Sequence, residues 1–157
     1  MSQHEFGDGP PIPPGIRVLH FALMAGVLMF AGVVGFLTEA SEDPSDPVSA
    51  GGNSDFEVLT WVAAGLIVAS LTTAFASRAR FFRLCSETED DAAAIRMFAT
   101  GSLIFAAVLE GSAFFALVVA LIQESFSPAG WMAIVPFAAM ALGIPSSGTF
   151  AGLRRLR

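Results

Sequence analysis

Long apolar stretches alternate with short polar stretches along the chain. Four of these stretches carry few charged residues or none, and they cover residues 16–38, 56–76, 95–122 and 130–150. A helix rises about 1.5 Å per residue, so each stretch is long enough to cross a hydrocarbon core of roughly 30 Å. None of them shows the strict alternation that is typical of membrane β-barrel strands. The sequence therefore predicts an all-α integral membrane protein with four transmembrane helices.

Polar segments divide this single membrane domain, which we expect to cover residues 16–153. Its helices are expected at about residues 16–38, 56–76, 88–123 and 130–150. The third is expected to begin before its apolar stretch, because residues 86–89 (Ser-Glu-Thr-Glu) fit a capping box. Pro145 is expected to bend or unwind the fourth helix. The remaining parts are a cytoplasmic tail at 1–15, an acidic outer loop at 39–55, and a cytoplasmic loop with a helix extension at 77–94.

Composition and charge strengthen this prediction and give it an orientation. Of the 157 residues, 54% are hydrophobic and the mean hydropathy is +0.67, which is too apolar for an ordinary water-soluble domain. The eight positive charges are all arginines, and in a four-span arrangement every one of them falls on the same side. The positive-inside rule then places both termini in the cytoplasm. We expect a multi-pass protein of a bacterial-type inner membrane, with Trp61 and Trp131 near its outer interface.

Several function classes find no support in the sequence. Cys85 is the single cysteine, which excludes an intramolecular disulfide and a cysteine-based metal cage. The two histidines, His4 and His20, show no metal-binding spacing, and no nucleophile–base pair is apparent. We therefore expect no catalytic residue, no metal and no cofactor, and we do not expect an enzyme. Nucleic-acid binding has no support either.

Glu110 is the residue that points most directly to function. It is the only charged residue between 103 and 121, and it lies 12 or 13 residues from the expected outer end of its helix, or roughly 18–20 Å. A carboxylate near the bilayer midplane costs several kcal/mol, so it marks a functional site by default. Burial disfavours the charged form, so we expect Glu110 to be protonated. Ser70, Thr72 and Thr73 on the second helix are candidate hydrogen-bond partners.

Small residues around Glu110 predict close helix contacts. A small-xxx-small row allows two helix backbones to approach each other in a membrane. The candidate packing residues on the third helix are Ala107, Gly111, Ser112, Ala116 and Ala120. Such contacts would serve either packing within one four-helix bundle or packing between protomers, and the sequence leaves both open.

The first and third helices are similar to each other. Residues 22–26 (Ala-Leu-Met-Ala-Gly) align with residues 107–111 (Ala-Val-Leu-Glu-Gly) without a gap. The similarity indicates either a duplication, with two related helical hairpins, or chance likeness between alanine-rich helices. In a duplication, Ala25 would occupy the position of Glu110 in the first copy.

Residues 109–121 (Leu-Glu-Gly-Ser-Ala-Phe-Phe-Ala-Leu-Val-Val-Ala-Leu) carry a family resemblance. This segment resembles the carboxylate-bearing helix of the c subunit of ATP synthase rotor rings and of the proteolipid of vacuolar-type ATPases. The chain is also similar to small four-span bacterial membrane proteins of unknown function that carry a Leu-Glu-Gly motif. The carboxylate here is on the third helix, whereas the duplicated proteolipids carry it on the second or fourth. The resemblance therefore implies a protonatable carboxyl rather than a rotor subunit.

Two functions remain from these observations. The first is an assembly or interaction subunit of a membrane complex, in which protonated Glu110 fixes helix packing. The alternative is binding or translocation of protons, in preference to sodium, through Glu110 in a c-subunit-like oligomer. The expected partners are the lipid bilayer, further copies of the chain or other membrane subunits and, in the alternative, protons.

Overall fold

The computed structural model describes residues 13–41 and 54–155, and helices dominate both segments. They are α1 (Pro14–Ser41), α2 (Ser54–Glu87), α3 (Asp91–Ile122), α4 (Ala129–Met132), α5 (Ile134–Leu142) and α6 (Ser147–Arg155). No strand occurs in these two segments, so the all-α prediction is confirmed. The tail at 1–12 and most of the expected acidic loop at 39–55 lie outside the described residues.

Three helices, α1, α2 and α3, are long and apolar enough to cross a membrane. A fourth crossing is present if the bent segment from α4 to α6 counts as a single span. The structure thus supports a membrane protein with three spans, or up to four. The most apolar window of each of these helices holds at most two charged residues, because a charged side chain in hydrocarbon is costly.

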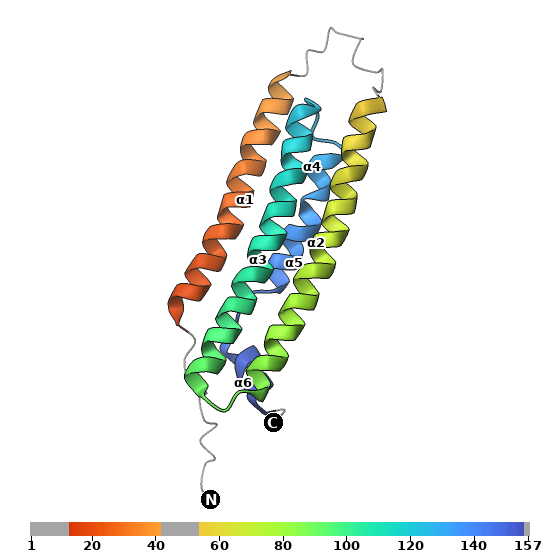
Figure 1. Cartoon of the computed structure of the whole chain (residues 1–157). Coiled ribbons are helices and arrows are strands. Elements are labelled where there is room, and N and C mark those ends of the chain that lie inside the picture. Colours follow the sequence, from red (N-terminus) through yellow and green to blue (C-terminus); the bar gives the residue numbers. More distant parts are fainter. Residues whose placement is uncertain (1–12, 42–53, 156–157) are drawn as a thin grey trace, which may run out of the picture.

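The α3 helix lies at the centre of the bundle. Half of its most apolar window is buried, compared with 17% in α1 and in α2. Figure 1 shows α1, α3 and α2 side by side, with α3 between the other two and with α4 and α5 behind them. Each of the three apolar clusters among the described residues includes side chains from α3. The buried side chains of α3 are therefore positioned by contacts with several other helices.

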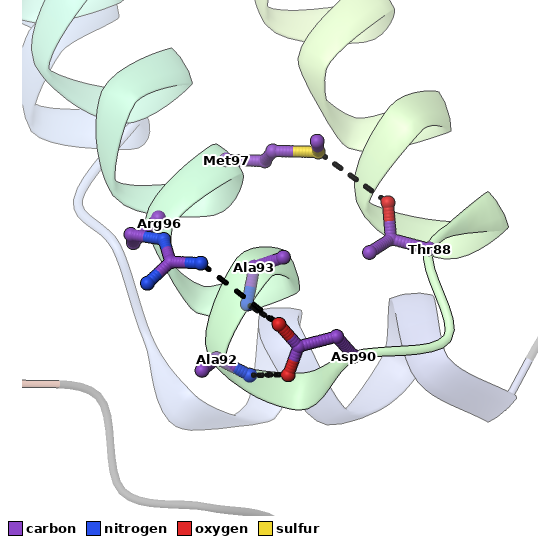
Figure 2. A network of polar contacts seen from close by, with 6 residues as sticks. All are labelled: Thr88, Asp90, Ala92, Ala93, Arg96 and Met97. Carbon is purple, nitrogen blue, oxygen red and sulfur yellow. Dashed lines mark hydrogen bonds and ion pairs between the residues drawn. The ribbon is translucent and has the colours of Figure 1, made fainter.

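A short turn joins α2 to α3 and contains a well-defined helix cap. Asp90 accepts hydrogen bonds from the backbone N–H groups of Ala92 (3.0 Å) and Ala93 (3.2 Å), and Arg96 lies 3.8 Å from the same carboxylate (Figure 2). The capping box expected to start at Ser86 is wrong, because α2 continues to Glu87. The Ser86 hydroxyl instead donates to the carbonyl of Arg83 within α2.

The fourth apolar stretch is not one continuous helix. The segments before and after residues 143–146 differ in direction by 67°, and Pro145 stands within this break. Proline lacks a backbone N–H and cannot continue the helical ladder. The next helix, α6, starts immediately afterwards, and the Ser146 hydroxyl accepts a hydrogen bond of 3.1 Å from the N–H of Thr149. The start of α1, the α2–α3 turn and α6 all lie at one end of the bundle (Figure 1).

Candidate functional site around Glu110

Glu110 lies where α3 faces α1. Its side chain is half-buried. A Cβ atom added to Gly26 on α1 would lie 3.6 Å from Glu110 Oε1 and 3.8 Å from Cζ of Phe114. One turn further along, Phe30 and Phe114 make an edge-to-face contact with ring centroids 5.2 Å apart. A glycine on α1 and two aromatic rings thus form the immediate surroundings of the carboxyl group.

The carboxyl group of Glu110 has no polar partner within the part of the chain that the structure describes. It makes neither a hydrogen bond nor an ion pair there. It is also not sealed in the core, because its side chain remains partly exposed at the edge of the α1–α3 contact. A protonated carboxyl in this position can donate one hydrogen bond to a group outside the described chain.

The hydroxyl groups expected to meet Glu110 are not brought to it. The Thr72 hydroxyl donates to the carbonyl of Val68 in its own helix at 2.8 Å. Thr72 and Thr73 are exposed and line an open hollow of about 780 Å³ along α2, and Ser70 is half-buried. The structure shows no hydrogen bond between Glu110 and any of the three. Glu110 is directed toward α1, whereas all three hydroxyl groups belong to α2.

The candidate packing residues separate into two groups. Ser112, Ala116 and Ala120 are buried inside the bundle, where the Ser112 hydroxyl donates to the carbonyl of Leu109 at 2.9 Å. Ala107 and Gly111 are exposed, and a Cβ on Gly111 would meet no atom within 4 Å. The first group therefore packs within this chain. The second lies on the surface beside Glu110.

Ala107 and Gly111 belong to a longer exposed stripe along α3. Residues three or four positions apart share one face of a helix. The exposed residues on this face are Ile104, Ala107 and Gly111 and, two turns further along, Val118 and Ile122; Phe114 and Phe115 between the two groups are half-buried. We call the five exposed residues the exposed α3 face. It is apolar throughout, it has small residues at its middle, and Glu110 precedes Gly111 directly.

Sequence reasoning missed a group of basic side chains at the break between α5 and α6. Arg17 and His20 contact the carbonyl oxygens of Pro145 and Met140, and Arg78 lies against Gly143. Arg17 and His20 are three residues apart, and this spacing is the one signal that could have indicated a shared helix face. Neither the surroundings of Glu110 nor these basic residues form a metal centre, because no group of three metal-binding side chains occurs within the described residues.

Comparisons with protein-family models, with curated proteins and with solved structures find no match to this chain.

Proposed function

We propose that the chain is an assembly subunit of a membrane complex, and that Glu110 in its uncharged form donates a hydrogen bond to a helix of a neighbouring subunit. The neighbour is a second copy of the chain or another membrane protein. In this proposal the chain crosses the membrane four times, with both termini in the cytoplasm. The distribution of the arginines supports this topology.

One observation carries the proposal, namely a carboxyl group without a polar partner in the described chain beside an exposed apolar face. A polar group in hydrocarbon without a hydrogen-bond partner costs free energy. A partner helix that supplies a carbonyl or hydroxyl oxygen would remove that cost. Hydrogen bonds between helices in membranes contribute roughly 0.6–2 kcal/mol, which is enough to fix the register of a contact.

The small residues of the exposed α3 face support a helix rather than a bulky group as the partner. Ala107 and Gly111 are four residues apart and allow close backbone approach. Leucine at Gly111 would block that approach. It would leave the fold intact, because a Cβ there meets no atom within 4 Å.

The oligomeric state in mild detergent, measured by native mass spectrometry, tests the proposal. The matched control is Gly32→Leu on α1, where the glycine is also exposed and a Cβ also meets nothing within 4 Å. We expect Gly111→Leu to dissociate a complex that the unchanged protein and Gly32→Leu both retain. A protein that is monomeric without any substitution, or equal assembly of both variants, would contradict the proposal.

Substitutions of Glu110 separate its two possible roles. Glu110→Gln keeps a hydrogen-bond donor and should preserve the complex, whereas Glu110→Leu should weaken it. The same variants address the alternative function, which is proton binding through Glu110. Partial exposure of the carboxyl favours this alternative, because a proton must be able to enter and leave. If proton uptake into vesicles depends on Glu110 and is lost in Glu110→Gln while assembly is retained, the proton-binding function is the correct one.

A further inference from the structure

Two side chains of α1 contact the break between α5 and α6. Arg17 donates from Nε to the carbonyl oxygen of Pro145 at 3.2 Å. His20 contacts the carbonyl oxygen of Met140 through Nε2 at 3.0 Å. A carbonyl oxygen only accepts hydrogen bonds, so Nε2 of His20 carries the proton. Both contacts are made to backbone carbonyl groups that the interrupted helix no longer pairs in the regular way.

A third basic side chain reaches the same break from α2. The guanidinium group of Arg78 lies over the rings of Phe82 and Phe105, at 5.0 Å and 4.6 Å from their centroids. A Cβ added to Gly143 would be only 2.7 Å from Nη1 of Arg78 and would overlap the Phe105 ring. Glycine at 143 therefore leaves the space that Arg78 occupies. Residues 143–145 thus have an arginine from α1 and an arginine from α2 beside them.

The positive charge at the break exceeds the negative charge that the described chain supplies. Neither Arg17 nor Arg78 forms an ion pair in the described residues. The carbonyl groups at the end of α5 carry only about half a negative charge in total. The N-terminus of α6, which begins at Ser147, adds a positive partial charge nearby. The two guanidinium groups, half-buried on Arg78 and exposed on Arg17, are therefore available to an anion at this position.

Two buried polar atoms, one on α1 and one on α3, also have no partner in the described residues. His20 is fully buried and its Nδ1 makes no hydrogen bond. The hydroxyl of Ser102, which is one turn before Phe105 on the buried face of α3, is likewise buried and unpaired. Buried polar groups in folded proteins are nearly always paired. With its proton on Nε2, Nδ1 of His20 can only accept a hydrogen bond, which fits a water molecule, whereas the Ser102 hydroxyl can also donate one.

We propose that the break between α5 and α6 binds a phosphate group through the guanidinium groups of Arg17 and Arg78. Guanidinium groups bind phosphate oxygens with paired, charge-assisted hydrogen bonds, and they stay charged when partly buried. The phosphate comes either from a phospholipid headgroup or from free phosphate. The site lies toward the end of the bundle that holds the α2–α3 turn (Figure 1). Basic pockets between helices at a cytoplasmic membrane surface are typical sites for lipid headgroups.

Binding is tested on the full-length protein in a neutral detergent, with short-chain phosphatidylglycerol titrated and bound lipid counted by native mass spectrometry. We expect saturable binding that becomes about tenfold weaker in Arg78→Gln and in Arg17→Gln, since each removes a charge-assisted bond. The matched control is Arg83→Gln, which removes an equal charge from an exposed pair with Glu87. Helix content by circular dichroism checks folding. If Arg78→Gln fails to fold, the lipid affinity of Arg17→Gln alone tests the proposal. Arg17 is exposed near the start of α1, so this substitution should not disturb folding.

A second titration with inorganic phosphate distinguishes the two sources. Displacement of the lipid by millimolar phosphate identifies a site for the free anion as well, whereas binding of the lipid alone identifies a headgroup site. Two results would overturn the proposal: the absence of saturable binding of either phosphate source, or equal affinity in Arg17→Gln and Arg83→Gln. The result is independent of assembly through the exposed α3 face, so this inference and the proposed function fail separately.

Discussion

Alanine at Gly101 tests a close contact between α2 and α3. Gly101 is buried on α3 and packs against Phe81 of α2. A Cβ at this position would lie 2.6 Å from Cβ of Phe81 and 3.1 Å from its Cγ, whereas ordinary contacts begin at 3.4 Å. The Cβ of Phe81 is bonded directly to the backbone, so a rotation of the side chain cannot remove the overlap. The two helices would have to move apart.

The expected cost follows from two opposing effects. Inserting a methyl group into a well-packed core costs about 1–3 kcal/mol. Replacing glycine by alanine within a helix recovers about 0.5–1 kcal/mol. Gly101→Ala should therefore lower the free energy of unfolding by roughly 1 kcal/mol, which is the difference between the central values of these two ranges. The separation of α2 from α3 should extend to the turn that joins them, because both helices run from this contact to the turn that contains Asp90.

Equilibrium unfolding in mixed micelles of a mild detergent and dodecyl sulfate, followed by circular dichroism, measures this change. The control is Gly65→Ala on α2, where a Cβ would meet no atom within 4 Å. It should leave stability unchanged or raise it by up to about 1 kcal/mol. If Gly101→Ala is as stable as Gly65→Ala, the close packing of α2 against α3 is refuted.

Three further predictions address the ends of the helices. Asp90→Ala should cost about 1 kcal/mol in the same unfolding assay, whereas Asp90→Asn, which retains a capping oxygen, should cost much less; equal losses would refute the cap. Thr60→Val should lower the free energy of unfolding by about 1 kcal/mol, because it removes the hydrogen bond of 2.8 Å that Gln123 Nε2 donates to Thr60. Unchanged stability would contradict this hydrogen bond between α2 and the end of α3. In a variant without the native cysteine, Ser127→Cys should react with an impermeant thiol reagent on intact cells, and Glu87→Cys only after permeabilisation; the reverse pattern would invert the topology.

The sequence was sufficient to predict the helical class, because long apolar stretches are a direct consequence of the hydrocarbon thickness. It was not sufficient to predict the direction of the Glu110 side chain. The expected partners were Ser70, Thr72 and Thr73 on α2, whereas Glu110 is directed toward Gly26 of α1. The angular position of a residue relative to its neighbours depends on how whole helices pack, and α3 is apolar on nearly every face.

At the ends of the helices, some features could be predicted from neighbouring residues, whereas others depend on residues that are distant in sequence. The sequence analysis placed the start of the third helix at a capping box beginning with Ser86. The structure uses Asp90, because α2 continues through Ser86 to Glu87. Pro145 indicated a bend from its own chemistry, and a 67° bend is present. The arginines beside this break come from helices that are distant in sequence, so no local pattern could have brought them together.

The claim that the exposed α3 face contacts another protein is tested most directly by photo-cross-linking in native membranes. A benzophenone amino acid replaces Ile104 on this face or, as the control, Met29 on α1, which is 75% exposed. We expect a defined protein adduct from position 104 that is lost when Gly111→Leu is added, and no such adduct from position 29. Protein adducts at neither position, or equal adducts at both, would contradict the assignment of this face as the contact surface.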